Sequence, residues 1–202
     1  MHFGLTEEQT LLQETLRGFI ANECPPNRLR ELFDSEQAHD PALWKGLAEM
    51  GLCGLVVPER YGGAELEVLD LALCCEELGS GALPGPLPFH SLASLAIARG
   101  GSDAQRERFL PALASGEKVG TIALAEPNDK WDPAEWSASL VAGVLSGKKL
   151  HVPFADVADL LVVGTSDGGL AVVEQGAEGL QINAVASADR TRPLSEVILD
   201  ST

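Results

Sequence analysis

The sequence changes its periodicity near Gly116, and this change constrains the possible folds more than any other feature. Before it, apolar residues such as Leu12 and Leu16 recur at helical spacing. After it, short β-prone runs alternate with Gly, Asp and Ser, a pattern typical of strands joined by turns. We therefore expect an α+β fold, in which an all-α N-terminal domain over residues 1–116 precedes an antiparallel β-barrel or β-sandwich domain over residues 117–202.

Local signals place the expected elements along the chain. Thr6 and Gln9 fit a capping box, in which each side chain accepts a hydrogen bond from the other residue's backbone N–H. Gly62 and Gly63 indicate a tight turn, since glycine permits a positive φ and a close backbone approach. The expected helices cover residues 6–23, 40–51, 66–79, 89–99 and 102–114, and the expected strands include residues 119–124, 160–163 and 170–173.

The third of these expected helices carries both apolar and acidic residues. Leu66, Leu69 and Leu73 form an apolar stripe at helical spacing, which predicts the buried face of this helix. Glu76 and Glu77 are expected on its solvated face, so neither glutamate is a candidate for acid or base chemistry.

Composition and charge argue against several classes of function. Fourteen Lys and Arg against thirty Asp and Glu give a net charge of −16, which would repel nucleic acid. The same charge would repel a polyanionic ligand unless basic side chains gather locally. No apolar run approaches the roughly 20 residues that a membrane span requires, so no membrane partner is expected. The N-terminus lacks the basic head and apolar core of a secretory signal, and we expect a cytoplasmic protein.

The four cysteines do not predict a metal site. Cys24, Cys53, Cys74 and Cys75 show no C-x-x-C spacing and have no nearby histidine of the kind that zinc sites use. We expect them to be small buried hydrophobic residues in a reducing compartment. No metal is therefore predicted.

A series of short motifs follows the chain in a distinctive order. The motifs are LTEEQ at 5–9, VPERYGG at 57–63, RFLPALASGE at 108–117, AEP at 125–127, GKK at 147–149 followed by AD at 158–159, and DRTR at 189–192. Each motif is weak by itself, but their order is specific. Together they resemble the acyl-CoA dehydrogenase family over essentially all of the chain.

This resemblance implies a flavin enzyme. In the family, a proton leaves the α carbon of an acyl-CoA thioester while the β hydrogen passes as hydride to FAD. The base is a glutamate on a C-terminal four-helix domain, which we expect to be absent here, so no catalytic residue is predicted; Glu126 is expected to be structural. By the resemblance, Trp131 would contact the acyl-CoA substrate, and FAD would be bound by Leu124, Ala125, His151, Val152 and Pro153.

Three departures from the family pattern affect these contacts. Ala125 stands where the family has a Thr or Ser whose hydroxyl bonds the flavin. Trp131 replaces the small serine of a G-S-D stretch, and His151 to Pro153 replace W-I-T or W-I-S. Proline supplies neither a hydroxyl nor a backbone N–H. We therefore expect this chain to bind FAD weakly by itself.

Three functions are compatible with this pattern. The leading hypothesis is an acyl-CoA dehydrogenase subunit, cut short or working in a homo- or hetero-oligomer whose other chain supplies flavin contacts and the base. The runner-up is a non-catalytic scaffold or interaction subunit that keeps the fold without the redox site. A third possibility is a protein that binds acyl-CoA without oxidising it. The sequence does not determine the acyl chain.

Overall fold

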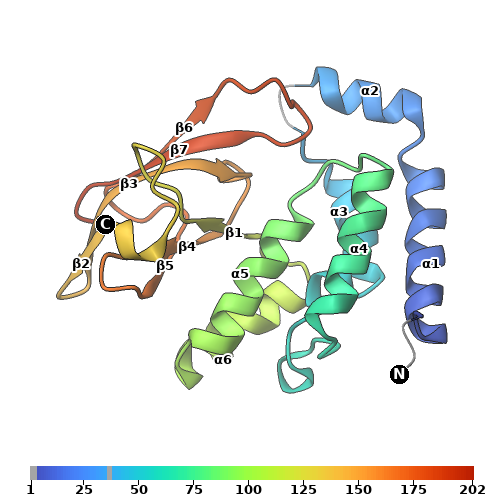
Figure 1. The fold of residues 1–202 in the computed structure, drawn as a ribbon, viewed down its shortest axis with the longest axis horizontal. Helices are drawn as coiled ribbons and strands as arrows, with labels where there is room; N and C mark the ends of the chain where they lie inside the picture. The colour runs from blue at the N-terminus through green and yellow to red at the C-terminus, as the bar shows by residue number, and fades with distance from the viewer. Residues whose placement is uncertain (1–3, 36–37) are drawn as a thin grey trace.

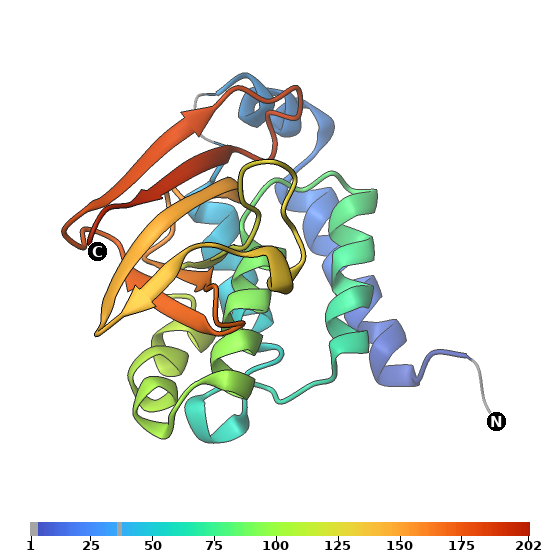
Figure 2. The same cartoon turned by 60° about the vertical axis from the view of Figure 1, so that its left-hand side comes forward.

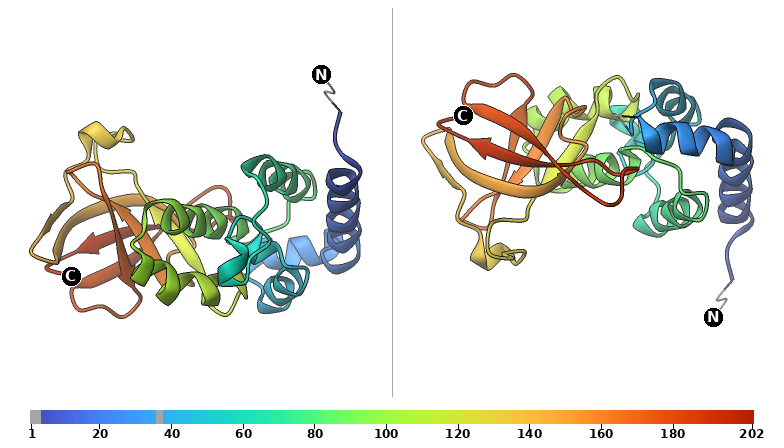
Figure 3. Two further views of the ribbon diagram at one scale, coloured as in Figure 1. Left: turned by 90° about the horizontal axis from the view of Figure 1, so that it is seen from below. Right: turned by 90° about the horizontal axis from the view of Figure 1, so that it is seen from above.

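The computed structural model describes residues 4–35 and 38–202, and the molecule is elongated, with helices at one end and strands at the other (Figures 1 and 3). The α-helices are α1 (Glu7–Glu23), α2 (Pro26–Asp34), α3 (Pro41–Glu49), α4 (Val68–Ser80), α5 (Leu87–Gly100) and α6 (Asp103–Ala114). The strands are β1 (Gly120–Ala123), β2 (Ser139–Val141), β3 (Val144–Pro153), β4 (Leu160–Gly164), β5 (Leu170–Glu174), β6 (Leu180–Val185) and β7 (Leu194–Leu199). The α+β fold class is confirmed, and the described chain contains no helix after β7.

Helix α1 begins as its sequence predicts. The hydroxyl of Thr6 accepts a hydrogen bond from the backbone N–H of Gln9, and the Gln9 side chain accepts one from the N–H of Thr6. These reciprocal bonds satisfy two of the backbone donors that a helix start leaves free. Leu16 is fully buried against α4, which confirms the inward face of α1.

Helix α4 forms where it was expected, but the predicted buried face is wrong. Leu73 is buried, whereas Leu66 is exposed and Leu69 is 58% exposed. The side facing α1 instead carries Glu77, which is buried and forms an ion pair with Arg17 at 2.6 Å between Oε1 and Nη2. Glu77 is therefore not on a solvated face. The reason is that Arg17 of α1 pairs with its carboxylate, and the spacing of leucines along α4 cannot reveal a partner on another helix.

Helix α2 was not predicted. Its nine residues carry few apolar side chains, and Leu32 is the one buried residue among them in the described chain. Pro26 occupies the first helical position, where its missing N–H has no helical partner to lose. Arg28 then pairs with Asp40, the residue that caps α3, at 2.6 Å between Nη2 and Oδ2. Tertiary contacts of this kind, rather than a long periodic pattern, stabilise the helix.

The turn at Gly62 and Gly63 confirms the expectation from its two glycines. Gly62 has a φ of +86°, in the left-handed region that favours glycine. A Cβ at Gly63 would lie 2.0 Å from the carbonyl oxygen of Val57, so no side chain fits there. The turn follows the short 3-10 helix η2 (Glu59–Tyr61), while another, η1 (Leu52–Gly54), precedes it.

The strands form two sheets that pack face to face around a shared core. One sheet has the order β1-β4-β5, and the other has the order β2-β3-β7-β6. The expected antiparallel arrangement holds for the other strand pairs but is wrong for β1 and β4, which run parallel. The chain leaves β1, forms β2 and β3 in the second sheet, and returns to the first sheet in its original direction. The core between the sheets includes Ala123, Leu145, Val152, Leu161, Val163, Val197 and Leu199.

Helices α5 and α6 cover the other face of the first sheet (Figure 2). In β4, Leu160 and Val162 pack against these helices, whereas Leu161 and Val163 face the second sheet, as the alternation of a strand requires. This shared packing joins the two halves of the molecule. The helices end at Ala114 and the strands begin at Gly120.

None of the helices in residues 4–35 and 38–202 has the length and apolar character that crossing a bilayer requires. All four cysteines are free; Cys24, Cys53 and Cys74 are buried and Cys75 is half-buried. Burial raises the pKa of the Cys53 thiol to about 12, so it stays protonated at neutral pH.

Candidate functional site

A cavity of about 390 Å³ lies where the start of α5 meets the ends of β1 and β3. Five of the six positions that the resemblance implied line it: Leu124, Ala125, Trp131, His151 and Pro153. The structure therefore brings together residues that lie up to 29 positions apart in the sequence. Val152 is the exception, since its side chain is buried in the core between the two sheets.

Five further lining residues were not predicted: Phe89, Ile122, Leu150, Arg192 and Leu194. Ile122 lies two positions before Leu124, so the period of a strand could have identified it. Leu194 reaches the cavity because it pairs with Pro153 across β7 and β3. Phe89 arrives with α5, and no local pattern signals either contact. Arg192 belongs to the DRTR motif, whose place beside the cavity depends on the strand pairing.

A bulge in β3 directs His151 out of the strand. The register between β3 and β7 shifts between Lys149 and Val152, and His151 has a φ of +53°. Such a φ is uncommon for a residue with a side chain, and strained positions of this kind cluster at functional sites. The backbone N–H of Leu150 donates a hydrogen bond of 2.8 Å to the carbonyl of Ala125, which ties the bulge to the segment just after β1.

The rings of Trp131 and His151 form one wall of the cavity. They are nearly parallel, with an angle of 6° between their planes and 6.4 Å between their centroids. Trp131 is 59% exposed and comes from the loop that connects β1 with β2. An aromatic side chain that remains so exposed while facing a cavity offers a flat apolar surface to a ligand.

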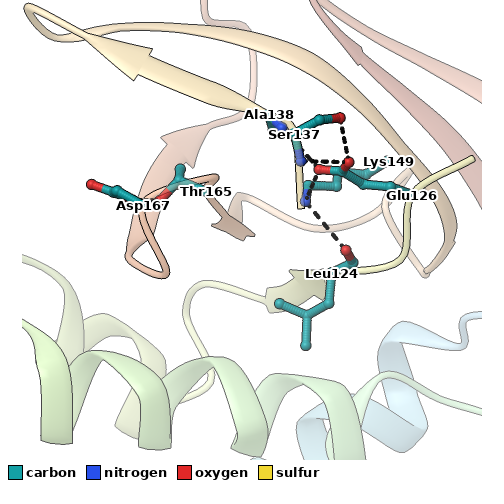
Figure 4. Close-up of polar contacts among 7 residues, drawn as sticks. All are labelled: Leu124, Glu126, Ser137, Ala138, Lys149, Thr165 and Asp167. Carbon is teal, nitrogen blue, oxygen red and sulfur yellow. Dashed lines mark hydrogen bonds and ion pairs between the residues drawn. The ribbon is translucent and has the colours of Figure 1, made fainter. Parts of the chain in front are cut away.

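The loop that carries Trp131 is held from beneath by a buried ion pair (Figure 4). Lys149 Nζ lies 2.7 Å from Glu126 Oε1, and both side chains are buried. The Glu126 carboxylate also accepts hydrogen bonds from the N–H and hydroxyl of Ser137 and from the N–H of Ala138. Lys149 donates a further bond to the carbonyl of Leu124. The two ends of the loop are therefore bound to the same charged pair.

These contacts give Glu126 a structural role. Burial acts to raise its pKa, but the hydrogen bonds from Lys149, Ser137 and Ala138 outweigh it and lower the pKa to about 2. Burial lowers the pKa of Lys149, which Glu126 partly offsets. Glu126 thus stays ionised and saturated with donors at neutral pH, and it does not line the cavity.

The chemistry of the lining is mainly apolar and aromatic. Among the residues that line this cavity in the described chain, none is Asp or Glu and none carries a hydroxyl. Three side chains offer N–H groups, those of Trp131, His151 and Arg192. Such a lining fits a flat ring system or an acyl group, and it contains no group suited to abstracting a proton from carbon. No group of His, Cys, Asp and Glu in the described residues could hold a metal ion.

Comparison with known proteins identifies the family. The family model described as the N-terminal domain of acyl-CoA dehydrogenase matches residues 6–117. The chain belongs to the acyl-CoA dehydrogenase family. Among curated relatives, mitochondrial isovaleryl-CoA dehydrogenase of Pongo abelii is 33% identical over 167 residues, which cover 79% of this chain and 40% of the relative.

Solved structures share the fold of this chain. The ChsE4-ChsE5 complex of Mycobacterium tuberculosis matches with a TM-score of 0.89 at 26% identity, covering 100% of this chain and 56% of that chain. Glutaryl-CoA dehydrogenase of Mycobacterium smegmatis, solved in complex with FADH2, matches with a TM-score of 0.84 at 28% identity, covering 98% and 54%. The chain therefore spans roughly half the length of these relatives.

Proposed function

We propose that this chain is a subunit of an acyl-CoA dehydrogenase, which carries out FAD-dependent α,β-dehydrogenation of an acyl-CoA thioester together with another chain. The proposal rests on one observation: five positions that the family pattern assigns to flavin and substrate line a single cavity. That cavity lies between the helices and the sheets, and we propose that the chain forms two domains, an α-helical one over residues 1–116 and a β one over residues 117–202.

The lining residues suggest how a ligand would be held. The flat flavin ring would pack against Leu124, Ala125 and the ring of His151. Trp131 would contact the thioester. FAD, when bound, would accept the hydride. Since no described lining residue is acidic, the base that takes the α proton must come from outside the described cavity. Hydrogen bonds to the flavin heteroatoms must also come largely from backbone groups or from another chain, because the lining lacks hydroxyls.

A partner chain supplies what this lining lacks. The similarity to the ChsE4-ChsE5 complex, in which two different chains assemble, supports a hetero-oligomer of acyl-CoA dehydrogenase subunits. A homo-oligomer is the alternative assembly. We place the protein in the cytoplasm, since its four free cysteines suit a reducing compartment.

The test is the flavin spectrum of the protein purified alone and after co-expression with a second acyl-CoA dehydrogenase subunit. We expect a weakly coloured or colourless protein alone, and a yellow complex that is bleached when an acyl-CoA thioester is added. A protein that stays colourless with every partner and binds no thioester would contradict the proposal.

One observation favours a second function, a non-catalytic scaffold. At the cavity, Ala125 and Pro153 remove two hydroxyls that the family pattern provides, and Trp131 adds bulk at the wall. A scaffold would assemble with a partner whose own flavin content and activity do not depend on this cavity. Replacing His151 with alanine in the complex distinguishes the two functions, since only a working site would lose flavin or turnover.

A further inference from the structure

A second cavity adjoins the first. It has a volume of about 480 Å³ and lies between the end of α4, the loop before α5, Phe154 and the turn that precedes β7. Phe89 and Arg192 line both cavities, so these two side chains stand between them. An elongated ligand that occupies the first cavity and extends into the second would pass directly beside Arg192.

The turn that carries Arg192 is held in place by its own hydrogen bonds. The Asp189 carboxylate accepts bonds from the N–H of Thr191 at 3.1 Å and from its hydroxyl at 2.6 Å. The carbonyl of Pro193 accepts a bond of 3.0 Å from the N–H of Phe154, directly after β3. The backbone on both sides of Arg192 is therefore fixed relative to the cavity wall.

The two Nη groups of the Arg192 guanidinium form no ion pair within the described residues. Its one ion pair in the described chain joins Nε to Asp189 Oδ2 at 3.7 Å, which leaves both Nη groups without a carboxylate partner there. Arg190, two positions earlier, is engaged differently: it pairs with Asp34, donates to the Asp34 carbonyl, and lies over the ring of Phe33. Arg190 lines neither cavity.

Arg192 places a positive charge beside the two cavities of a strongly acidic chain. The chain carries a net charge of −16, so a negatively charged ligand is repelled unless it meets a local cation. Arg192 is the only Lys or Arg among the described residues that line the two cavities. A guanidinium binds the oxygens of phosphate or carboxylate through paired N–H groups.

We propose that Arg192 binds an anionic group, a phosphate or a carboxylate, of a thioester ligand whose acyl part lies in the 390 Å³ cavity. This inference rests on the proposed function for the ligand class and adds the residue that recognises its charge. The anion is either a phosphate of the CoA moiety or a carboxylate at the far end of the acyl group.

Calorimetry with three matched thioesters tests the inference and identifies the anion. Pentanoyl-CoA carries the CoA phosphates, pentanoyl-pantetheine has the same acyl group without them, and glutaryl-CoA adds a terminal carboxylate. The variants are Arg192→Ala, Arg192→Lys and, as the matched control from the same turn, Arg190→Ala. Thermal unfolding of each variant verifies that it is folded.

If Arg192 binds phosphate, Arg192→Ala weakens binding of pentanoyl-CoA at least about tenfold and leaves pentanoyl-pantetheine unchanged. If it binds the carboxylate, the loss falls on glutaryl-CoA alone. In both cases Arg192→Lys retains part of the affinity and Arg190→Ala retains all of it. Wild-type binding that Arg192→Ala does not weaken overturns this inference alone. A wild-type protein that binds none of the thioesters, either alone or in complex with a second acyl-CoA dehydrogenase subunit, overturns the proposed function and this inference together.

Discussion

At the scale of single residues, Glu126 and Lys149 decide how the cavity loop is held. Both side chains are buried, and the carboxylate accepts bonds from Lys149, Ser137 and Ala138. Removing one member of a buried ion pair leaves the other charge without compensation, which typically costs about 3–5 kcal/mol. The pair therefore matters less for chemistry than for keeping Trp131 and Ala125 beside the cavity.

The lowered pKa of Glu126 predicts how stability responds to acid. Its pKa is about 2 in the folded protein against 4.5 for an unperturbed glutamate, so the unfolded state binds more protons between these values. The stabilisation is complete above pH 4.5 and is lost as the pH falls towards 2, by about 3 kcal/mol. Urea unfolding across this range measures it. In Glu126→Gln the slope should be shallower, and an unchanged slope would contradict the assignment.

Restoring one hydroxyl should not restore the cofactor site. Pro153→Thr adds a hydroxyl at the cavity wall, and one hydrogen bond contributes about 0.5–1.5 kcal/mol, at most roughly a tenfold gain in affinity. We therefore expect the purified single variant to retain little FAD, because most contacts must come from elsewhere. Absorbance of the purified protein measures the retained flavin. Stoichiometric FAD in this variant would show that proline alone prevents binding.

At the scale of elements, the inward face of α1 gives a direct test of packing. Leu16 is fully buried, whereas Leu11 on the same helix is 63% exposed. Leu16→Ala should reduce the free energy of unfolding by about 2–5 kcal/mol, since it removes buried methyl groups and leaves a cavity. Leu11→Ala is the matched control and should change it by less than about 0.5 kcal/mol. Chemical denaturation compares the two, and similar losses would refute the packing.

The glycine turn separates two kinds of backbone constraint. A side chain at Gly62 meets open space but must adopt a φ of +86°, which costs about 1 kcal/mol. A side chain at Gly63 collides with the carbonyl of Val57 and forces the backbone to move. Gly63→Ala should therefore lower the thermal midpoint more than Gly62→Ala. The reverse order would mean that the close approach is not present in solution.

The same elements show which features local sequence can predict. The first residues of α1 and α6 follow from N-capping side chains that act within one turn, so Thr6 and Ser102 could be identified from sequence. The buried face of α4 depends on partners in α1, 60 positions away in the case of Arg17 and Glu77. The parallel pairing of β1 with β4 is equally non-local, and no turn motif signals it.

The candidate site divides in the same way. Ala125, Trp131 and His151 could be identified because their motifs match a family pattern position by position. Phe89 and Arg192 join them through helix packing and strand register, which the sequence does not display. Val152 illustrates the opposite case: it lies beside His151 in sequence, but the strand turns its side chain into the core.

At the scale of the whole molecule, His90 connects the two halves. It is fully buried in α5, its Nδ1 accepts a hydrogen bond from the N–H of Gly120 in β1, and its Nε2 lies 3.2 Å from the carbonyl of Cys53. The ring also meets Trp44 edge-on at 5.0 Å between centroids. Because these contacts span helices and sheet, we expect both halves to unfold in one transition.

Burial predicts a pH effect at this junction. It lowers the pKa of His90 from 6.5 to about 4, so between these values the unfolded state binds the extra proton. The contribution of neutral His90 to the free energy of unfolding should be fully present above pH 6.5. It should decline by up to about 3 kcal/mol as the pH falls to 4. Burial lowers the pKa of His39 as well, so the measurement compares wild type with His90→Gln. Equal declines in both proteins would exclude His90 as the source.

The charged pair beneath the cavity loop has a consequence for protein engineering. At the start of the loop, Lys149 of the pair donates a hydrogen bond to the carbonyl of Leu124. At its end, Ser137 and Ala138 donate hydrogen bonds to the Glu126 carboxylate. The stretch 127–135 lies between these two anchors and includes the exposed Trp131, and the ion pair holds its two ends without using any side chain of the stretch itself. Substitution libraries confined to residues 127–135 should therefore change ligand preference while the rest of the fold keeps its shape.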